Sequence, residues 1–238
     1  MQKSILIILV CFFFLNCEDK KKQEETIDKD VKTDTLVKAR DVEEVVELEK
    51  EEDTLHKIVK LTNDTLEDFL LNYGKENPER FVNLETPHGV IELELYNNTP
   101  IHRAHFIYLI KNGYLNTTFF HRVVNDFMVQ GGNSDRVETS KMRGRMGKYT
   151  LPAEIIHKHR RGALAAAKEY RDNPDDRSSA FEFYIVQGPK GAHHLDPNYT
   201  VFGKVLSGMD VVDTIAALET DDGDWPLYNV FIKATLKE

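Results

Sequence analysis

Cysteine is almost absent from the sequence: Cys11 and Cys17 are its only two, and both lie near the start of the chain. Everything after Cys17 can therefore contain no disulfide, no cysteine nucleophile and no cysteine zinc site. Positive charge is also in deficit, since the 238-residue chain has a formal net charge of −9. A nucleic-acid partner is not expected, because a phosphate backbone attracts a basic surface.

A recognisable metal-binding pattern is missing as well. Nine histidines are present, but no cluster of cysteine or carboxylate ligands at a familiar spacing accompanies them. We therefore expect neither a metal site nor a cofactor. The close histidine pairs are His102/His105, His157/His159 and His193/His194.

The chain begins with a short apolar segment from Ile5 to Leu15 that leads into Cys17. This run is too short to span a bilayer comfortably, and it is typical of a secretory signal. It also resembles a bacterial lipoprotein signal, in which the cysteine becomes the lipidated first residue. We expect residues 1–17 to be a lipoprotein-type signal peptide with lipidation at Cys17. The protein would then be anchored to a membrane outside the cytoplasm, at the periplasmic face or cell surface. The alternatives are an ordinary signal peptide and an uncleaved apolar anchor.

Residues 18–60 are dominated by lysine, glutamate and aspartate. A segment with so little apolar surface to bury predicts a charged, flexible tether. Within it, Val42–Lys50 has helix-forming residues, so both a transient helix and a plain spacer remain open.

Residues 61–78 are predicted to form a helical extension, because apolar residues recur there at helical spacing. Asn63 or Asp64 can cap the helix, and Gly74 is placed to end it. We expect its apolar stripe to pack on the domain that follows. The stripe consists of Leu66, Phe69, Leu70 and Tyr73.

From residue 79 the pattern changes to short alternating or apolar runs. Pro87-His88-Gly89 separates the first two runs as a turn, and Thr99-Pro100 opens a helix. A second helix follows Gly208. Many short strands with two good helices predict a mainly β fold, a closed eight-stranded antiparallel β-barrel capped by two α-helices. The predicted strands are residues 81–86, 90–96, 120–124, 127–130, 163–167, 181–186, 200–205 and 230–236.

Residues 133–148 carry several basic side chains. We expect a solvated surface loop there, with a site that attracts acidic partners as the alternative. The basic residues are Arg136, Lys141, Arg143, Arg145 and Lys148.

Three segments carry a resemblance to a known family. The first is Phe119–Gly132, with the sequence FFHRVVNDFMVQGG. The second is Gly162–Ala167 followed by Phe183–Val186, and the third is Leu195–Gly203 followed by Gly208–Val212. Their order and content resemble those of cyclophilin-type peptidyl-prolyl cis–trans isomerases. The resemblance covers residues 79–238 and implies one cyclophilin-like domain with prolyl isomerase activity.

Prolyl isomerisation rotates an X–Pro amide against a resonance barrier of roughly 18–20 kcal/mol. No bond breaks, so the reaction needs no nucleophile, metal or redox group. A hydrogen-bond donor near the proline nitrogen stabilises the twisted amide over the planar one. The resemblance implies that Arg122 is this donor and that Gln130 contacts the substrate backbone. These two are the predicted catalytic residues.

The other predicted site residues surround the proline. In Phe181–Val186, strand alternation puts Glu182 and Tyr184 on one face, which is the expected groove because a buried unpaired carboxylate is costly. Glu182 stands where the family usually has glutamine. If it pairs with Arg122, it either orients that residue or weakens it as a donor, and our hypothesis is slower catalysis. His121 is interpreted as structural support. The predicted substrate-binding residues are His121, Phe127, Met128, Glu182, Tyr184, Leu195 and Tyr199.

Together these features predict a prolyl isomerase that assists the folding of exported proteins, because X–Pro isomerisation is slow enough to limit folding. The expected partners are proline-containing peptides, unfolded exported proteins and a membrane reached through Cys17. We expect a monomer. The alternatives are a proline-peptide-binding module or chaperone with little turnover, and a purely structural surface lipoprotein.

Overall fold

The computed structural model describes residues 58–168 and 172–237. The predicted signal peptide, the lipidation at Cys17 and residues 18–57 of the predicted tether lie outside these described residues. Ile58 packs against the hydrophobic core, and the Val59 carbonyl accepts a hydrogen bond from the Tyr108 hydroxyl at 2.8 Å. The described chain is therefore in contact with the domain from its first residues.

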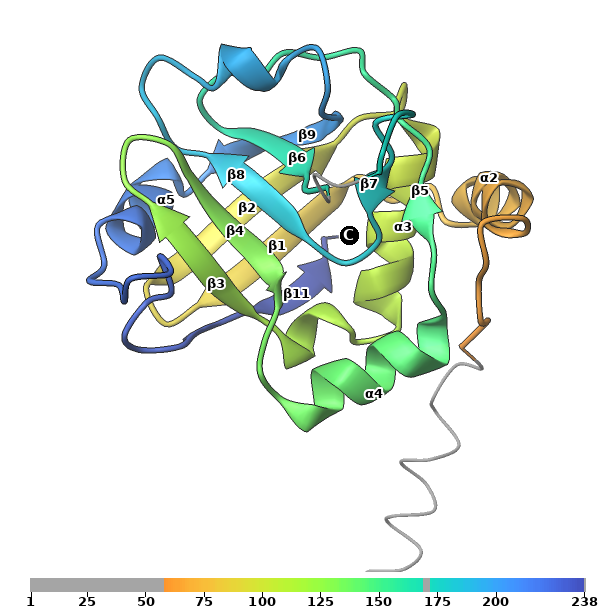
Figure 1. The fold of residues 1–238 in the computed structure, drawn as a ribbon, viewed down its shortest axis with the longest axis horizontal. Helices are drawn as coiled ribbons and strands as arrows, with labels where there is room; N and C mark the ends of the chain where they lie inside the picture. The colour runs from red at the N-terminus through yellow and green to blue at the C-terminus, as the bar shows by residue number, and fades with distance from the viewer. Residues whose placement is uncertain (1–57, 169–171, 238) are drawn as a thin grey trace, which may run out of the picture. The chain divides into compact units, whose positions relative to one another are not determined.

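The main strands form one antiparallel sheet that curves into a nearly closed barrel (Figure 1). Its order is β10-β3-β4-β8-β6-β9-β2-β1-β11. β10 pairs with β3 at one edge and β11 pairs with β1 at the other, and only Ile232 separates these two strands. One chain segment thus joins both edges, which confirms the eight-stranded barrel predicted from the sequence. The bounds are β1 Phe81–Thr86, β2 Gly89–Leu95, β3 Phe119–Val124, β4 Met128–Asn133, β6 Ala163–Ala166, β8 Phe183–Val186, β9 Val201–Ser207, β10 Val230–Phe231 and β11 Lys233–Leu236.

Strand alternation separates two apolar clusters. The larger cluster fills the barrel and includes Leu93, Phe183 and Ile185. A smaller cluster includes Tyr184, which occupies the intervening position on the same strand, together with Met128. Because successive side chains of a strand point to opposite faces, the smaller cluster lies on the outer face of β4 and β8.

Two helices cover the ends of the barrel, as predicted, and two more lie beside it (Figure 1). The helix after Thr99 begins where the sequence places it, but the Thr99 hydroxyl donates to the Tyr96 carbonyl. The backbone N–H groups of Ile101 and His102 donate instead to the Glu154 carboxylate. A negative charge at this position also stabilises the helix dipole. The helices are α2 Leu66–Glu76, α3 Pro100–Lys111, α4 Val137–Met146 and α5 Met209–Ala216, with short 3₁₀ turns η1 Leu115–Thr117 and η2 His193–Leu195.

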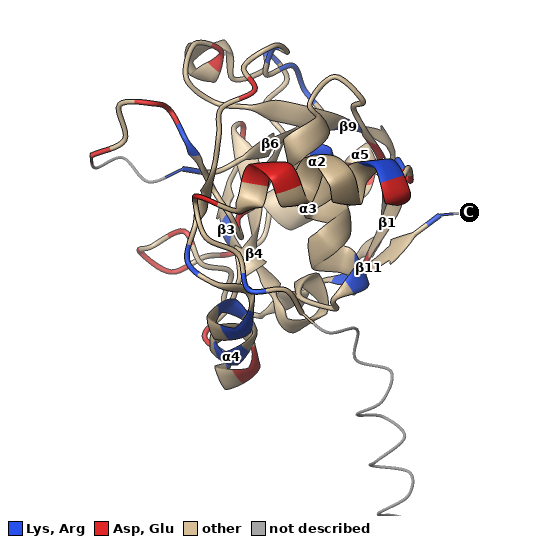
Figure 2. Cartoon of the chain, turned by 90° about the vertical axis from the view of Figure 1, so that its right-hand side faces the viewer, with Lys and Arg blue, Asp and Glu red and all other residues tan. Residues whose placement is uncertain are grey.

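The extension helix α2 packs against the outer side of α3 (Figure 2). Gly74 does not end this helix, contrary to prediction, but lies inside it. A Cβ at Gly74 would lie 3.0 Å from the Cβ of Ala104, so glycine allows the two helices to approach closely. Because α2 covers α3, every residue from Ile101 to Ile110 is buried. The predicted cap Asn63 accepts the Thr150 N–H instead.

Arg103 of α3 holds the end of α2. Its buried guanidinium donates to the carbonyls of Gly74, Asn77 and Glu79 at 2.8, 3.0 and 3.3 Å. Burial lowers the pKa of Arg103, and the neighbouring Glu79 opposes that effect. A cation at a helix C-terminus also stabilises the helix dipole.

Residues 133–148 are not a surface loop, because α4 spans most of them. Only Thr139 and Met146 of this helix are buried, so apolar spacing gives little sign of it. Arg143 donates to the Tyr114 hydroxyl at 2.8 Å and to the Gly132 carbonyl at 3.0 Å. Side-chain hydrogen bonds therefore hold α4 beside the barrel. A separate two-stranded sheet pairs β5 Thr150–Leu151 with β7 Ser178–Ser179.

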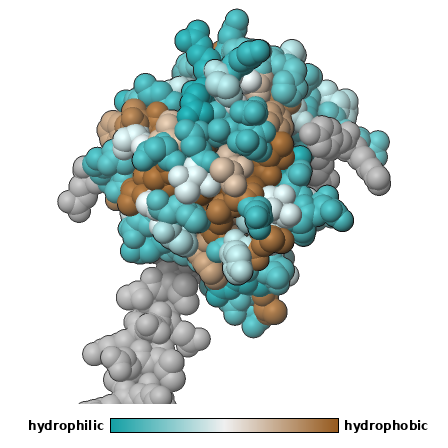
Figure 3. Space-filling view, turned by 90° about the vertical axis from the view of Figure 1, so that its left-hand side faces the viewer, coloured by the Kyte–Doolittle hydropathy of each residue, from teal (hydrophilic) through white to brown (hydrophobic). Residues whose placement is uncertain are grey.

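The described surface is mixed in character. On one face, hydrophobic side chains gather near the middle and hydrophilic ones surround them (Figure 3). Large apolar side chains that remain exposed include Leu227, Tyr228 and Phe231. None of the described helices is both long enough and apolar enough to span a membrane.

Candidate active site

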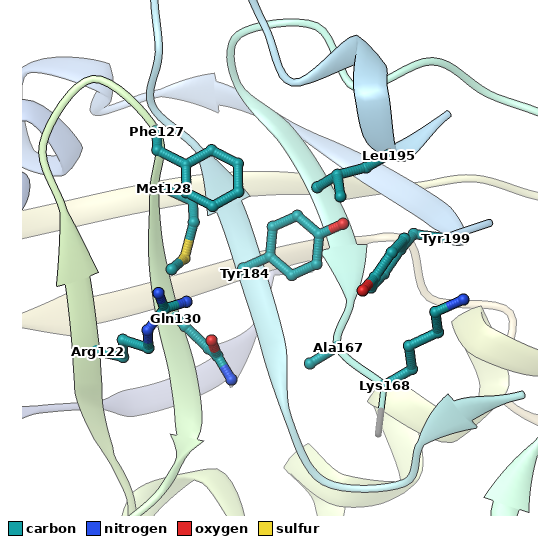
Figure 4. A pocket seen from close by; sticks show the side chains of 9 residues that line it. All are labelled: Arg122, Phe127, Met128, Gln130, Ala167, Lys168, Tyr184, Leu195 and Tyr199. Atoms are coloured by element: carbon teal, nitrogen blue, oxygen red, sulfur yellow. The ribbon is translucent and has the colours of Figure 1, made fainter. Parts of the chain in front are cut away.

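A groove of about 310 Å³ lies on the outer face of β4 and β8. Figure 4 shows Tyr184 in its middle, with Arg122, Met128 and Gln130 on one side and Leu195 and Tyr199 on the other. These side chains come from β3, β4, β8, η2 and the segment before β9. The complete lining is Arg122, Phe127, Met128, Gln130, Ala167, Lys168, Tyr184, Leu195 and Tyr199.

The apolar part of the groove is built on well-packed residues. Met128 and Tyr184 are 2% and 4% exposed, and Phe127 and Leu195 pack against the same cluster. The rings of Tyr184 and Tyr199 meet edge to face with centroids 6.3 Å apart. Such a preformed apolar slot suits a small apolar ring.

Arg122 lies at the polar side of this slot and is paired with Asp224. Oδ2 of Asp224 lies 3.1 Å from Nε and 3.0 Å from Nη2 of Arg122. The backbone also joins the two segments, because the Val123 N–H donates to the Asp224 carbonyl at 2.9 Å. Asp224 has a φ of 64°, a left-handed conformation that aspartate tolerates better than most residues. The guanidinium is thus held along one edge.

Glu182 lies beside the groove and contacts Gln130 instead of Arg122. Its Oε2 accepts from Gln130 Nε2 at 2.9 Å, and its Oε1 lies 3.6 Å from Arg143 Nη2. Burial alone would raise the pKa of Glu182, but His121, Arg143 and Gln130 together lower it below the usual range. The ionised carboxylate can only accept hydrogen bonds, so it fixes the Gln130 amide with its NH₂ toward Glu182. Pairing of Glu182 with Arg122, which the sequence left open, is therefore not what the structure shows.

His121 lies next to Glu182 and does not line the groove itself. Its Nε2 lies 3.7 Å from Glu182 Oε2, and its ring packs on Trp225 with centroids 5.7 Å apart. Among the described residues, its buried Nδ1 has no hydrogen-bond partner.

Seven of the nine predicted site residues therefore line one groove, and the other two, His121 and Glu182, lie next to it. Sequence reasoning did not assign Asp224 or Ala167 to the site. Lys168 also lines the groove. Its ammonium lies 4.4 Å from the centre of the Tyr199 ring and pairs with Asp176.

Within residues 58–168 and 172–237, no group of three or more histidine, cysteine, aspartate or glutamate side chains is arranged to hold a metal ion. The lining of the groove itself offers hydrogen-bond donors and acceptors around an apolar slot.

Comparisons with known proteins agree with the fold. Residues 81–236 match the family model for cyclophilin-type peptidyl-prolyl cis–trans isomerases. A peptidyl-prolyl cis–trans isomerase of Acinetobacter baylyi is 39% identical over 141 residues, which is 58% of this chain and 73% of that protein. One from Dictyostelium discoideum is 36% identical over 161 residues, covering 66% of this chain and 97% of that protein.

Solved structures are similar as well. A cyclophilin-type isomerase of Cryptosporidium parvum superposes with a TM-score of 0.57 at 24% identity, covering 67% of this chain and 98% of that one. The same protein in the presence of the dipeptide Ala-Pro gives a TM-score of 0.56, covering 67% and 99% of the two chains. At this identity the likeness concerns the fold.

Proposed function

The chain belongs to the cyclophilin-type peptidyl-prolyl cis–trans isomerase family, and we propose that it uses the groove beside Arg122 to isomerise X–Pro bonds in exported proteins. The observation that carries the assignment of the site is that Arg122 and the apolar slot line one cavity. Prolyl isomerase activity follows from family membership, whereas the role of each residue and the exported substrates belong to the proposal.

The proline ring enters the apolar slot of Phe127, Met128, Tyr184 and Leu195. Three features support this placement: the slot is apolar, it is preformed, and it opens beside a fixed donor. The related Cryptosporidium parvum cyclophilin was solved in the presence of Ala-Pro, a dipeptide that contains the group we place here. Holding the ring leaves the amide bond at the side of Arg122.

Arg122 stabilises the twisted amide. Rotation removes the amide resonance and returns a lone pair to the proline nitrogen, which then accepts a hydrogen bond. Asp224 accepts from Nε and Nη2, and no described residue accepts from Nη1, so that amino group is available to the substrate. Because the planar amide nitrogen is a poor acceptor, this interaction favours the transition state over either ground state.

Gln130 positions the peptide backbone. Glu182 fixes the NH₂ of its amide, so the carbonyl oxygen Oε1 remains to accept a backbone N–H of the substrate. The Glu182 carboxylate thereby determines that Gln130 presents a hydrogen-bond acceptor to the groove.

The test compares turnover of a proline-containing peptide by the full chain and by Arg122→Ala. Removing a fixed transition-state donor should lower kcat/KM by about 10²–10³-fold. Arg145→Ala is the matched control, because Arg145 is an exposed arginine on α4 outside the groove lining. Unchanged turnover in Arg122→Ala would remove the role given to Arg122.

A second candidate function is a proline-peptide-binding module with little turnover. The observation that favours it is the Arg122–Asp224 pair, since two N–H groups of the guanidinium are already engaged. Peptide binding by the full chain without acceleration of isomerisation would establish this alternative.

The exported substrates are proposed from the N-terminal segment, where an apolar run leads into Cys17. We propose lipidation at Cys17 and attachment to a membrane outside the cytoplasm. Cys17→Ala should move the protein from the membrane fraction to the soluble fraction, and Cys11→Ala should not. An equal distribution of both variants would contradict a lipid at Cys17.

A further inference from the structure

A buried histidine that the proposed mechanism does not use lies behind the apolar slot. The side chain of His159 is 0% exposed, and both of its ring nitrogens are hydrogen-bonded. Nε2 lies 2.9 Å from the Tyr184 hydroxyl, and Nδ1 lies 2.9 Å from Asp196 Oδ1. His159 therefore connects a wall of the slot with an acidic residue behind it.

The direction of these hydrogen bonds is fixed by Asp196. Burial would raise the pKa of Asp196, but the backbone and side-chain hydrogen bonds from His159, with help from His193, lower it to about 2. An ionised carboxylate only accepts, so Nδ1–H of His159 donates to it. Burial lowers the pKa of His159 despite the opposite effect of Asp196. The neutral ring then has a lone pair at Nε2, and the Tyr184 hydroxyl donates to it.

The same histidine packs against two residues of the groove and hydrogen-bonds the residue next to a third. Its ring is nearly parallel to Tyr184 at 12°, and its edge meets Tyr199 at 89°. Asp196 directly follows Leu195, and the His159 backbone N–H also donates to Asp196 Oδ1 at 2.7 Å. Figure 4 shows the Tyr184 hydroxyl directed toward the side of Leu195 and Tyr199.

We propose that His159 is a positioning residue for the proline slot, which orients the Tyr184 ring through its hydroxyl and the Leu195 segment through Asp196. This inference rests on the proposed function, because it assumes that the slot receives proline. A phenylalanine at position 184 would line the slot equally well but would offer His159 no donor. The Tyr184 hydroxyl thus anchors the ring to His159, while the ring itself lines the slot that receives the substrate.

The experiment is a double-mutant cycle in the full chain, read out as the affinity for the dipeptide Ala-Pro and as KM and kcat. Tyr184→Phe removes the donor and leaves a buried acceptor, so the dissociation constant and KM should rise by about fivefold or more, with kcat less affected. His159→Leu should weaken binding too. In the His159→Leu background, Tyr184→Phe should add little, because the two residues act through one hydrogen bond.

A matched pair elsewhere in the chain controls for general loss of stability. His105 and Tyr149 also form a buried pair, with His105 Nε2 3.0 Å from the Tyr149 hydroxyl and ring centroids 5.6 Å apart, but neither lines the groove. Tyr149→Phe and His105→Leu should leave KM and the Ala-Pro affinity unchanged. The ¹⁵N chemical shifts of His159 give an independent readout, which should report a neutral ring protonated at Nδ1. Because Tyr184→Phe is a mild change, it keeps the inference testable even if His159→Leu does not fold.

The outcomes separate this inference from the proposed function. Unchanged affinity and KM in Tyr184→Phe, or additive effects in the cycle, would overturn the role of His159 while leaving isomerase turnover intact. Wild-type protein that binds Ala-Pro without turnover would refute the proposed function, and His159 would then be judged on affinity alone. Wild-type protein that does not bind Ala-Pro would refute both.

Discussion

Asp224 and Arg122 are 102 positions apart in the chain, yet one carboxylate oxygen of Asp224 contacts both Nε and Nη2 of Arg122. This arrangement occupies one edge of the guanidinium and fixes the plane of the rest. A flexible arginine would lose side-chain entropy each time it met a substrate. In the proposed mechanism the ion pair removes part of that loss in advance, so Asp224 holds Arg122 in place as the donor.

Asp224→Asn should therefore lower kcat/KM. Both side chains are about two-fifths exposed, so solvent screening limits the pair to under about 1 kcal/mol, and we expect a decrease of roughly two- to fivefold. Asp222→Asn, in the same loop, is the matched control for the change in charge. A gain in activity for Asp224→Asn alone would mean that the pair restrains Arg122.

Glu182→Gln should lower activity by a few fold, about two- to fivefold, because a glutamine no longer dictates the orientation of the Gln130 amide. The side-chain amide resonance of Gln130 should shift or broaden in the same variant. Glu138→Gln, on the exposed face of α4, should change neither. Faster turnover in Glu182→Gln would instead support the hypothesis that Glu182 slows catalysis.

Two glycines in helices should respond oppositely to alanine. Gly74→Ala places a methyl group 3.0 Å from the Cβ of Ala104, so it should reduce the free energy of unfolding by about 1–3 kcal/mol. Gly144→Ala meets nothing within 4 Å in α4 and should increase it by up to about 1 kcal/mol. Urea denaturation measures both, and equal effects would contradict the tight packing of α2 on α3.

Stability should fall as the pH is lowered through the range where free histidine titrates. Burial lowers the pKa of His105 to about 3 and also lowers that of His159. The unfolded chain therefore binds more protons than the folded one below about pH 6.5, at up to about 1.4 kcal/mol per pH unit for each histidine. The pKa values of Glu182 and Asp196 are lowered in the folded protein, so these carboxylates also stabilise it. That contribution to stability begins to fall only when the pH approaches their ordinary pKa values of 4.5 and 3.8.

Urea midpoints measured between about pH 7 and pH 5 isolate the histidine contribution. His105→Leu should show a shallower dependence because one titrating group is gone. A midpoint that rises toward acid pH would contradict neutral burial of these rings.

The barrel was predictable because the alternation of apolar and polar residues can be read within each short strand. Alternation in Phe181–Val186, together with the cost of burying Glu182, placed Tyr184 on the groove face, and Tyr184 lines the groove in the structure. The motif around Arg122 and Gln130 lies on two strands in direct register, so one short stretch of sequence positions both residues.

The contacts that sequence reasoning missed are long-range or lack apolar spacing. Nothing near Asp224 indicates that it reaches Arg122, since the two meet only when the barrel closes. The helix α4 buries too few apolar residues to show a period of 3.6. The link from Tyr184 to His159 joins β8 to the loop that precedes β6, and these segments meet because β6 and β8 are neighbours in the sheet.

The contacts of Arg103 indicate that the family domain and the part of the chain that unfolds together do not begin at the same residue. The family match starts at residue 81, whereas the carbonyls that accept hydrogen bonds from Arg103 belong to residues 74, 77 and 79. A protein trimmed to the family match would lose all three carbonyl partners of Arg103 and would expose to water the face of α3 that α2 covers. The extension α2 therefore belongs to the same cooperative folding unit as the barrel. The limits of the family match alone do not show where this domain can be truncated.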